Sequence, residues 1–310
     1  MSESGQANQK PSRPVHEWIV AGTLVVTSLA AVAALYFTRQ SIQATNGQLQ
    51  ISEQGQITDR YNAATTNLGS GSIEIRLGGI YALQRLMQDS SRDQPTVVAV
   101  LCAFVRDQTG SLTKRQTLNR ALPHGQPTDI QAALTVVGTR ATNHDTRTTV
   151  VDFDHAQLAG ARLGSLHLSH ADFTSADLVD ADLSRADLTG ADLTDVDLAD
   201  AELSAAHVTG ADLTGAHLTG ADLDHANLIR ANLGGADLTR ADLSRTDLTR
   251  ADLLHAKVNH TDFTGATLTG ALWPADAAVP EGWQRDHTGH LTRLGPPPLP
   301  SARPSPAPPN

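Results

Sequence analysis

The chain has 310 residues, with 23 Lys and Arg against 33 Asp and Glu, and a formal net charge of −10. Only 4% of the residues are aromatic, and the single cysteine, Cys102, excludes an intramolecular disulfide and argues against a thiolate metal site. Residues 150–272 hold 20 acidic and 7 basic residues, so this segment carries all of the excess acidity. Such a surface argues against direct nucleic-acid binding, which needs clustered Lys and Arg.

The first predicted element is a membrane-spanning helix at residues 18–37, preceded by a flexible N-terminus at residues 1–17. The apolar run contains no charged side chain, and twenty residues at about 1.5 Å each span the roughly 30 Å hydrocarbon core. A cleaved signal peptide is the alternative, because residues 31–33 have the small-x-small form of a cleavage site. The apolar run continues past that site. We therefore expect a single-pass protein of the cell membrane.

A helical neck is predicted over residues 38–147. Apolar residues recur at helical spacing after the membrane segment and again in SIEIRLGGIYALQRLMQD. The next helix is expected to open at Asp93, ahead of Pro95, and to pack on the preceding one as a hairpin. Cys102 on its apolar face is expected to be a buried hydrophobe, not a reactive thiol. A polar connector at 109–127 and a helix at 129–140 complete this region.

Residues 150–273 repeat with a period of five. Every fifth residue from 153 to 273 is Leu in 19 of 25 units, and the residue two positions earlier is Ala in 20 of them. Five residues turn an α-helix by about 500°, and in a strand an odd step sends alternate side chains to opposite faces, so neither element buries these leucines together. A chain that turns a corner once per unit does so. Four corners close a square coil of 20 residues.

The tandem A-D-L-x-x units resemble the pentapeptide-repeat family. That resemblance implies an all-β fold, a right-handed quadrilateral β-helix, whose six coils at strand spacing form a rod of about 29 Å. Departures at Leu166, Val196, Thr246 and Thr261 are expected to mark local widening. The segment ITDRYNAATTNLGS with IEIRLGGIYALQRL is similar to the neck of other bacterial repeat proteins with a membrane helix. Their layout implies a cytoplasmic rod, against a Lys/Arg bias of one charge.

Because residues 20 positions apart stack, the sequence predicts two acidic ladders on opposite faces of the rod. Short carboxylates beside a corner accept backbone hydrogen bonds, so a structural role is the first expectation, and an interaction with a protein is the functional alternative. One ladder contains Asp172, Asp192, Asp212 and Asp252, and the other contains Asp182, Glu202, Asp222, Asp242 and Asp262.

The chemistry expected of the chain is binding, without catalysis. It has no nucleophile elbow, zinc-protease motif or phosphate-cradling loop, so we expect no enzyme and no cofactor or metal. The favoured function is a membrane-anchored scaffold that presents the acidic rod to an unidentified protein partner. The resemblance implies an alternative, because the best understood pentapeptide proteins resemble duplex DNA and bind DNA gyrase. Homo-oligomers through the last coil are a further option.

The C-terminal end is expected to finish the rod. Trp273 takes the last central position, and residues 274–294 form a cap that stops edge-to-edge growth. After Gly295 the sequence PPPLPSARPSPAPPN predicts an extended, solvated and disordered tail at residues 295–310.

Overall fold

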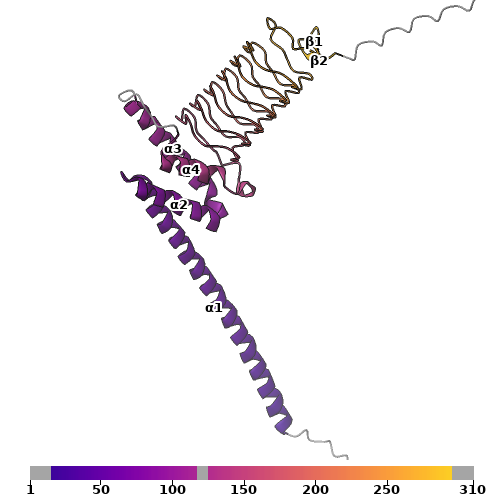
Figure 1. The fold of residues 1–310 in the computed structure, drawn as a ribbon. Coiled ribbons are helices and arrows are strands. Elements are labelled where there is room, and N and C mark those ends of the chain that lie inside the picture. Colours follow the sequence, from indigo (N-terminus) through magenta and orange to yellow (C-terminus); the bar gives the residue numbers. More distant parts are fainter. Residues whose placement is uncertain (1–14, 117–124, 295–310) are drawn as a thin grey trace, which may run out of the picture. The chain divides into compact units, whose positions relative to one another are not determined.

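The computed structural model describes residues 15–116 and 125–294, so the predicted tail and most of the predicted flexible N-terminus lie outside the described residues (Figure 1). Its contacts define two units with the boundary between Asp59 and Arg60. The elements in chain order are α1 (Val15–Leu68), α2 (Ile73–Asp89), the 3₁₀ turn η1 (Ser91–Asp93), α3 (Gln94–Gln116), α4 (Thr128–Gly138), the 3₁₀ turn η2 (Thr142–His144), the repeats, β1 (Trp283–Arg285) and β2 (Leu291–Arg293).

Helix α1 runs for 54 residues and contains the apolar segment without interruption. A stretch of 27 residues, Gly22–Gln48, is long and apolar enough to cross a membrane, and a signal sequence near the N-terminus would share these properties. The Thr27 and Thr38 hydroxyls donate to carbonyl oxygens four residues earlier, at 2.9 and 2.8 Å. Each of these hydroxyls therefore has a hydrogen-bond partner within the helix itself.

Helices α2, α3 and α4 pack together around a small apolar core. Cys102 is 1% exposed in that core, and burial raises the pKa of its thiol to about 12. The thiol is therefore protonated at physiological pH, which confirms the expectation of a buried hydrophobe. The other fully buried members include Ile80 and Leu83 of α2, Val97, Val98 and Leu101 of α3, and Ile130 and Leu134 of α4.

One boundary in the neck differs from the prediction. The sequence predicts a polar connector from residue 109, whereas α3 continues to Gln116. The reason is that polarity does not end a helix: Leu112, Lys114, Arg115 and Gln116 all have high helix propensity. The start of α3 agrees with the prediction, since the helix begins at Gln94, directly after Asp93.

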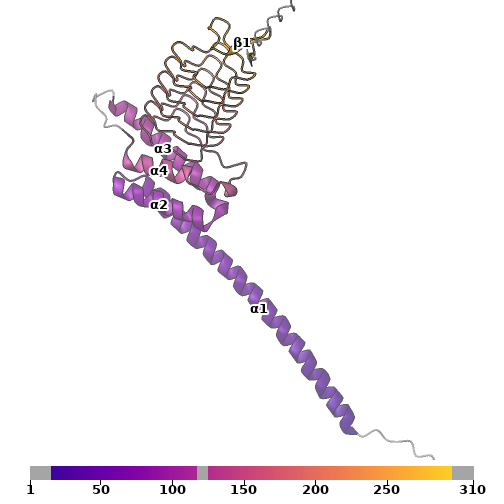
Figure 2. The same cartoon turned by 45° about the vertical axis from the view of Figure 1, so that its right-hand side comes forward.

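The repeats form square coils that stack into a right-handed β-helix (Figure 2). Parallel bridges join residues 20 apart on each of the four sides. In each unit up to Leu253 the central N–H donates to a carbonyl 19 residues ahead, as Leu163 does to Asp182 at 2.7 Å. From the second coil onward, the N–H before each central residue donates back to the preceding coil, as Asp182 does to the Ala161 carbonyl at 2.9 Å. The fifth residue of each unit supplies the corner in the left-handed region, with φ from 53° to 75°. This confirms the predicted fold.

Inside the coils, leucine and alanine form the core, and most central side chains are 0% exposed. Each fully buried leucine contributes about 1.5–3 kcal/mol before conformational entropy is counted. Two departures from Ala at the second inward position are explained by hydrogen bonds. Thr246 and Thr261 donate their hydroxyls to the carbonyls of Leu223 and Leu238, at 3.0 and 2.7 Å. Each hydroxyl thereby finds a partner one coil below.

The N-terminal edge of the first coil is closed by side chains of the neck. The Gln131 amide accepts from the Arg162 N–H at 2.9 Å and donates to the Arg162 carbonyl at 2.7 Å, so it replaces the peptide group of a missing coil. The backbone N–H of His167 donates to the Gly138 carbonyl at 2.8 Å, and the His167 carbonyl accepts a hydrogen bond from the Arg140 guanidinium at 2.8 Å. The edge is therefore hydrogen-bonded, not open to another strand.

Leu166 departs from the alanine pattern at this same junction. A Cβ on Gly138 would lie 2.7 Å from the Leu166 side chain, so α4 approaches the first coil through a glycine and the large residue fills the contact. The departure that predicted local widening thus marks the docking of α4.

At the C-terminal end, a short antiparallel hairpin of β1 and β2 covers one side of the last coil. Leu272 forms an antiparallel bridge with His290, and the Gly270 N–H donates to the Leu291 carbonyl at 2.8 Å. Trp273 is 1% exposed and donates its indole N–H to the Ala278 carbonyl at 3.2 Å.

Candidate functional site

The carboxylates of the predicted ladders lie at the position before each central residue. Within each ladder their neighbours are joined by parallel bridges, and Asn232 separates Asp212 from Asp252. Eight of the nine accept a hydrogen bond on Oδ1 from the backbone N–H two residues ahead. They are Asp172, Asp182, Asp192, Asp212, Asp222, Asp242, Asp252 and Asp262. These carboxylates therefore fix the turn that follows each of them.

Glu202 is the exception in the ladders. Its side chain is one methylene longer than that of Asp, and within the described residues its carboxylate accepts no hydrogen bond from a turn N–H. It is exposed, as are Asp192 and Asp262, whereas the other six ladder residues are half-buried. Within the predicted set these three are the exposed residues.

Three exposed carboxylates were missed by the ladder pattern because they lie at corners. Asp180, Asp195 and Asp200 each occupy the fifth position of a unit, with φ of 56°, 54° and 56°. Asp195 and Asp200 extend over Gly215 and Gly220 of the next coil, where a Cβ would lie 2.3 Å from Oδ1. Glycine leaves the room that these carboxylates occupy. The fifth position of the repeat could have revealed these carboxylates in the sequence, since its side chains point outward from every corner.

Together these residues form an acidic belt, which we define as Asp180, Asp192, Asp195, Asp200 and Glu202. All five are exposed, and among the described residues none of them forms an ion pair within 4.0 Å. The two coils at residues 171–210 contain ten acidic residues and one basic residue. Charge in this part of the rod is therefore uncompensated.

Farther along the rod the charge is balanced. Residues 231–250 hold three aspartates and three arginines. Arg245 pairs with Asp224 at 2.6 Å, and Lys257 pairs with Asp237 at 3.0 Å. Hydrogen bonds from Thr239, together with Lys257, lower the pKa of Asp237. The excess acidity of residues 150–272 is concentrated in the second and third coils of the rod.

Within those two coils one carboxyl lies in a less favourable environment. Burial raises the pKa of Asp177, and the Asp197 charge one coil away raises it further, against a hydrogen bond from the Val179 N–H. Like charges directly opposite each other on neighbouring strands are destabilising. Asp177 and Asp197 therefore form one pair of stacked carboxylates in these coils whose mutual repulsion raises a pKa.

Comparison with known proteins identifies the repeats. The family described as "Pentapeptide repeats" matches residues 152–190, 191–228 and 231–270 in 8 copies. No curated protein matches the chain.

Several solved structures are similar to it. A pentapeptide repeat protein of the Arabidopsis thaliana thylakoid lumen is 37% identical over 32% of this chain and 69% of its own, with a TM-score of 0.31. Rfr23 of the cyanobacterium Cyanothece 51142 is 31% identical over 33% of this chain and 59% of its own, with a TM-score of 0.23. HetL of Nostoc sp. strain PCC 7120, described as involved in heterocyst differentiation regulation, is 29% identical over 41% and 78%, with a TM-score of 0.18.

Proposed function

We propose that this chain, whose residues 152–270 belong to the pentapeptide-repeat family, is a non-enzymatic, membrane-anchored scaffold that binds a basic protein partner through its acidic belt. The observation that carries the proposal is the uncompensated charge of the belt. Asp180 and Asp200 are stacked one coil apart, and within the described residues neither carboxylate accepts a hydrogen bond from a turn N–H. Their mutual repulsion therefore lowers the stability of the fold, and no structural hydrogen bond offsets it. Such groups are expected where a partner supplies the missing positive charge.

The proposed anchor is the apolar part of α1. Its described side chains are exposed, including Leu24 at 65%, Leu29 at 64% and Leu35 at 71%. A soluble helix would bury such residues against another element, whereas a lipid bilayer covers them directly. Anchoring holds the scaffold at the membrane surface, where its partner is also expected.

A charge-matched pair of variants tests the belt. The first carries Asp180→Asn, Asp195→Asn and Asp200→Asn; the control carries Asp222→Asn, Asp242→Asn and Asp252→Asn, which remove the same charge elsewhere. Asn keeps the Oδ1 acceptor, so the control retains its turns. Full-length chains are used for affinity capture from solubilised membranes, with recovered proteins quantified by mass spectrometry. A partner that is retained by the control and lost by the belt variant supports the proposal, and equal recovery contradicts it.

DNA mimicry is the second candidate, because a rod of stacked acidic coils could replace a DNA duplex on a DNA-binding enzyme such as gyrase. The arginines at the corners of the later coils interrupt that likeness: Arg230, Arg240, Arg245 and Arg250. A gyrase supercoiling assay separates the two functions. Slower supercoiling at micromolar concentrations of residues 38–310 would favour mimicry over the scaffold, and an unaffected reaction would exclude gyrase as the target.

We also propose that the repeat domain faces the cytoplasm. The chain offers a clean labelling background, because Cys102 is buried and its thiol has a pKa of about 12. In a Ser305→Cys variant, the introduced cysteine is therefore expected to react with a maleimide, whereas Cys102 is not. In intact cells, an impermeant maleimide should leave this variant unlabelled until the membrane is permeabilised, and labelling of intact cells would place the rod outside.

A further inference from the structure

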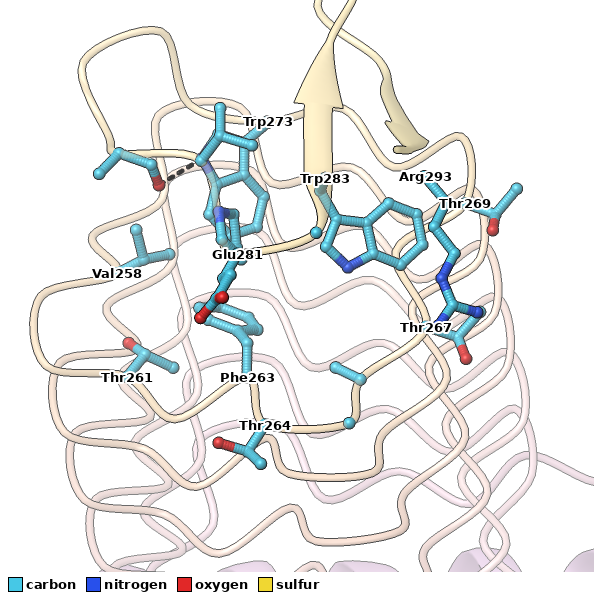
Figure 3. A pocket seen from close by; sticks show the side chains of 16 residues that line it. Val258, Thr261, Phe263, Thr264, Thr267, Thr269, Trp273, Glu281, Trp283 and Arg293 are labelled. Atoms are coloured by element: carbon cyan, nitrogen blue, oxygen red, sulfur yellow. Dashed lines mark hydrogen bonds between the residues drawn. The ribbon is translucent and has the colours of Figure 1, made fainter. Parts of the chain in front are cut away.

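The last coil is only partly covered, and a groove of about 670 Å³ lies where the next coil would start. Figure 3 shows this groove between Phe263 and Trp273 on one side and Trp283 with Arg293 on the other. Val258 and Phe263, which lie along it, are half-buried. All other central side chains of the repeats are buried. The apolar interior of the β-helix is therefore incomplete on this side.

The backbone of the groove is also incomplete. In every coil before residue 251 the central N–H and the corner N–H donate to carbonyls of the next coil, as the Arg250 N–H does to the Thr269 carbonyl at 3.0 Å. Among the described residues, the corresponding N–H groups of Val258, Phe263 and Gly265 have no acceptor, and the carbonyls of Thr261 and Ala266 have no donor from a following coil. The edge thus presents more donors than acceptors. A segment rich in carbonyls and poor in N–H groups would match it.

The walls of the groove add aromatic surface. Trp273 uses its indole N–H on the Ala278 carbonyl, whereas the half-buried Trp283 has no indole hydrogen bond within the described part of the chain. Exposed aromatic faces with an available indole donor are the features that bind polyproline II segments. Such segments lack N–H groups at each proline, so they supply mainly carbonyl acceptors.

The chain itself provides such a segment directly beside the groove. Arg293 at the end of β2 lines the groove, and the Leu294 N–H donates to the carbonyl of Gly282, another lining residue, at 2.9 Å. The next residues are GPPPLPSARPSPAPPN, in which eight of sixteen are proline. In a polyproline II conformation, at about 3.1 Å per residue, sixteen residues reach about 50 Å.

We propose that residues 296–300, PPPLP, dock in this groove as a polyproline II segment, with their carbonyls on the open backbone N–H groups and their rings against Trp283 and Phe263. The solvated tail that the sequence alone predicts is thereby replaced, for its first part, by a bound one. Docking completes the cover of the last coil, because a proline-rich strand cannot donate to a further strand. The tail then blocks end-to-end pairing of two rods.

The test is competition between the tail and a synthetic peptide of residues 295–310 that carries a fluorophore. Two proteins are compared in the same detergent: the full chain and a chain that ends at Leu294. Saturable binding to the truncated chain is expected from fluorescence anisotropy. Binding to the full chain should be at least about tenfold weaker, because a tethered segment has an effective concentration of about millimolar.

Two variants locate the site. Trp283→Ala in the truncated chain should abolish peptide binding, whereas Trp283→Phe, which keeps a ring, should retain it. A peptide with Ser at the positions of Pro296, Pro297, Pro298 and Pro300 should not bind. Circular dichroism and the melting temperature verify that each protein is folded. Acrylamide quenching of tryptophan fluorescence in a Trp18→Phe background gives a second measurement that needs no peptide, and it reports on Trp283 because the remaining Trp273 is 1% exposed. Truncation should increase that quenching.

Three results would overturn the proposal. The first is equal peptide affinity for the full and the truncated chain, and the second is no binding up to millimolar peptide together with unchanged quenching. The third is a full-length chain that forms dimers in sedimentation, with Trp283→Ala converting them to monomers, since a second copy would then occupy the groove. These outcomes are independent of the belt variants, because the groove and the acidic belt share no residue.

Discussion

Gln131 acts as a substitute for backbone at the first coil of the β-helix. Its side-chain amide pairs with both polar groups of the Arg162 peptide, and Gln131 is 9% exposed. An amide is suitable because it carries a donor and an acceptor at the spacing of a peptide group. At Arg162 the neck thereby continues the hydrogen-bond ladder with the side chain of one residue.

Gln131→Ala is expected to destabilise the folded state by about 1–3 kcal/mol, because it removes two part-buried hydrogen bonds to the Arg162 backbone, each of which contributes about 0.5–1.5 kcal/mol. Urea unfolding of the full chain measures the change. Gln88→Ala is the matched control, since Gln88 is an exposed residue of α2 and should alter the unfolding free energy by less than about 0.5 kcal/mol. Equal effects of the two substitutions would exclude the ladder role of Gln131.

Asp177 gives a pH dependence of known sign. Because burial and Asp197 raise its pKa in the folded state, the stability that this group contributes is complete at low pH and is lost as the pH rises through the folded pKa. Asp177→Asn retains an Oδ1 for the Val179 N–H. Its melting temperature should exceed that of the wild type at pH 7, and the gain should disappear near about pH 3.

Asp262→Asn serves as the opposite case. Hydrogen bonds from Thr264 lower the pKa of Asp262, so its contribution is complete at neutral pH and is lost as the pH falls through the folded pKa. This substitution should lower the melting temperature at pH 7. If both Asn variants shift the melting temperature in the same direction, the assigned environments are wrong.

At the level of single residues, the sequence predicts the features that recur with the period of five. The inward leucines, the turn aspartates and their stacking all follow from that period. Gln131 lies 31 residues from Arg162 in a non-repeating segment, so no periodicity reveals its partner. Asp180, Asp195 and Asp200 were missed for a different reason, since the ladder pattern considers only the position before the leucine.

At the scale of elements, the crossing of α1 and α2 depends on a pair of glycines with opposite roles. A Cβ on Gly79 would lie 2.7 Å from the Ala64 carbonyl oxygen, whereas a Cβ on Gly78 would meet no atom within 4 Å. The sequence GG alone predicts only a weakened helix. The close approach that requires the second glycine is a tertiary contact, which the local pattern does not contain.

Gly79→Ala and Gly78→Ala should therefore have opposite effects on stability. The first forces α1 and α2 apart and should destabilise the fold by about 1–3 kcal/mol. The second replaces glycine in a helix and should stabilise it by about 0.5–1 kcal/mol. Thermal unfolding followed by circular dichroism measures both, and a stabilising Gly79→Ala would show that the helices do not cross at this residue.

At the scale of the whole molecule, the two ends of the β-helix are protected by different means. Neck side chains close the N-terminal edge, and the hairpin of β1 and β2 closes one side of the C-terminal edge. Stacked coils have an intrinsic tendency to add further strands at any open edge. The period predicts the coils, but it carries no information on what covers the first and the last of them.

Removal of the neck should expose the first coil. A fragment of residues 150–294 is expected to self-associate through the unpaired groups of Arg162 and His167, whereas residues 60–294 should remain largely monomeric at the same concentration. Sedimentation velocity distinguishes the two. A monomeric 150–294 fragment would indicate that neck side chains are not needed to block pairing at this edge.

The backbone hydrogen bonds that join successive coils of the repeats connect residues 19 or 21 positions apart. Each coil is therefore related to the next by the same rotation and translation. Removal of any twenty consecutive residues from the interior of the rod joins two positions that are equivalent in successive coils, and it leaves both ends unchanged. Natural variation in the length of such a protein is therefore expected in whole layers. The length of the rod is therefore expected to change in steps of one coil, or about 4.8 Å.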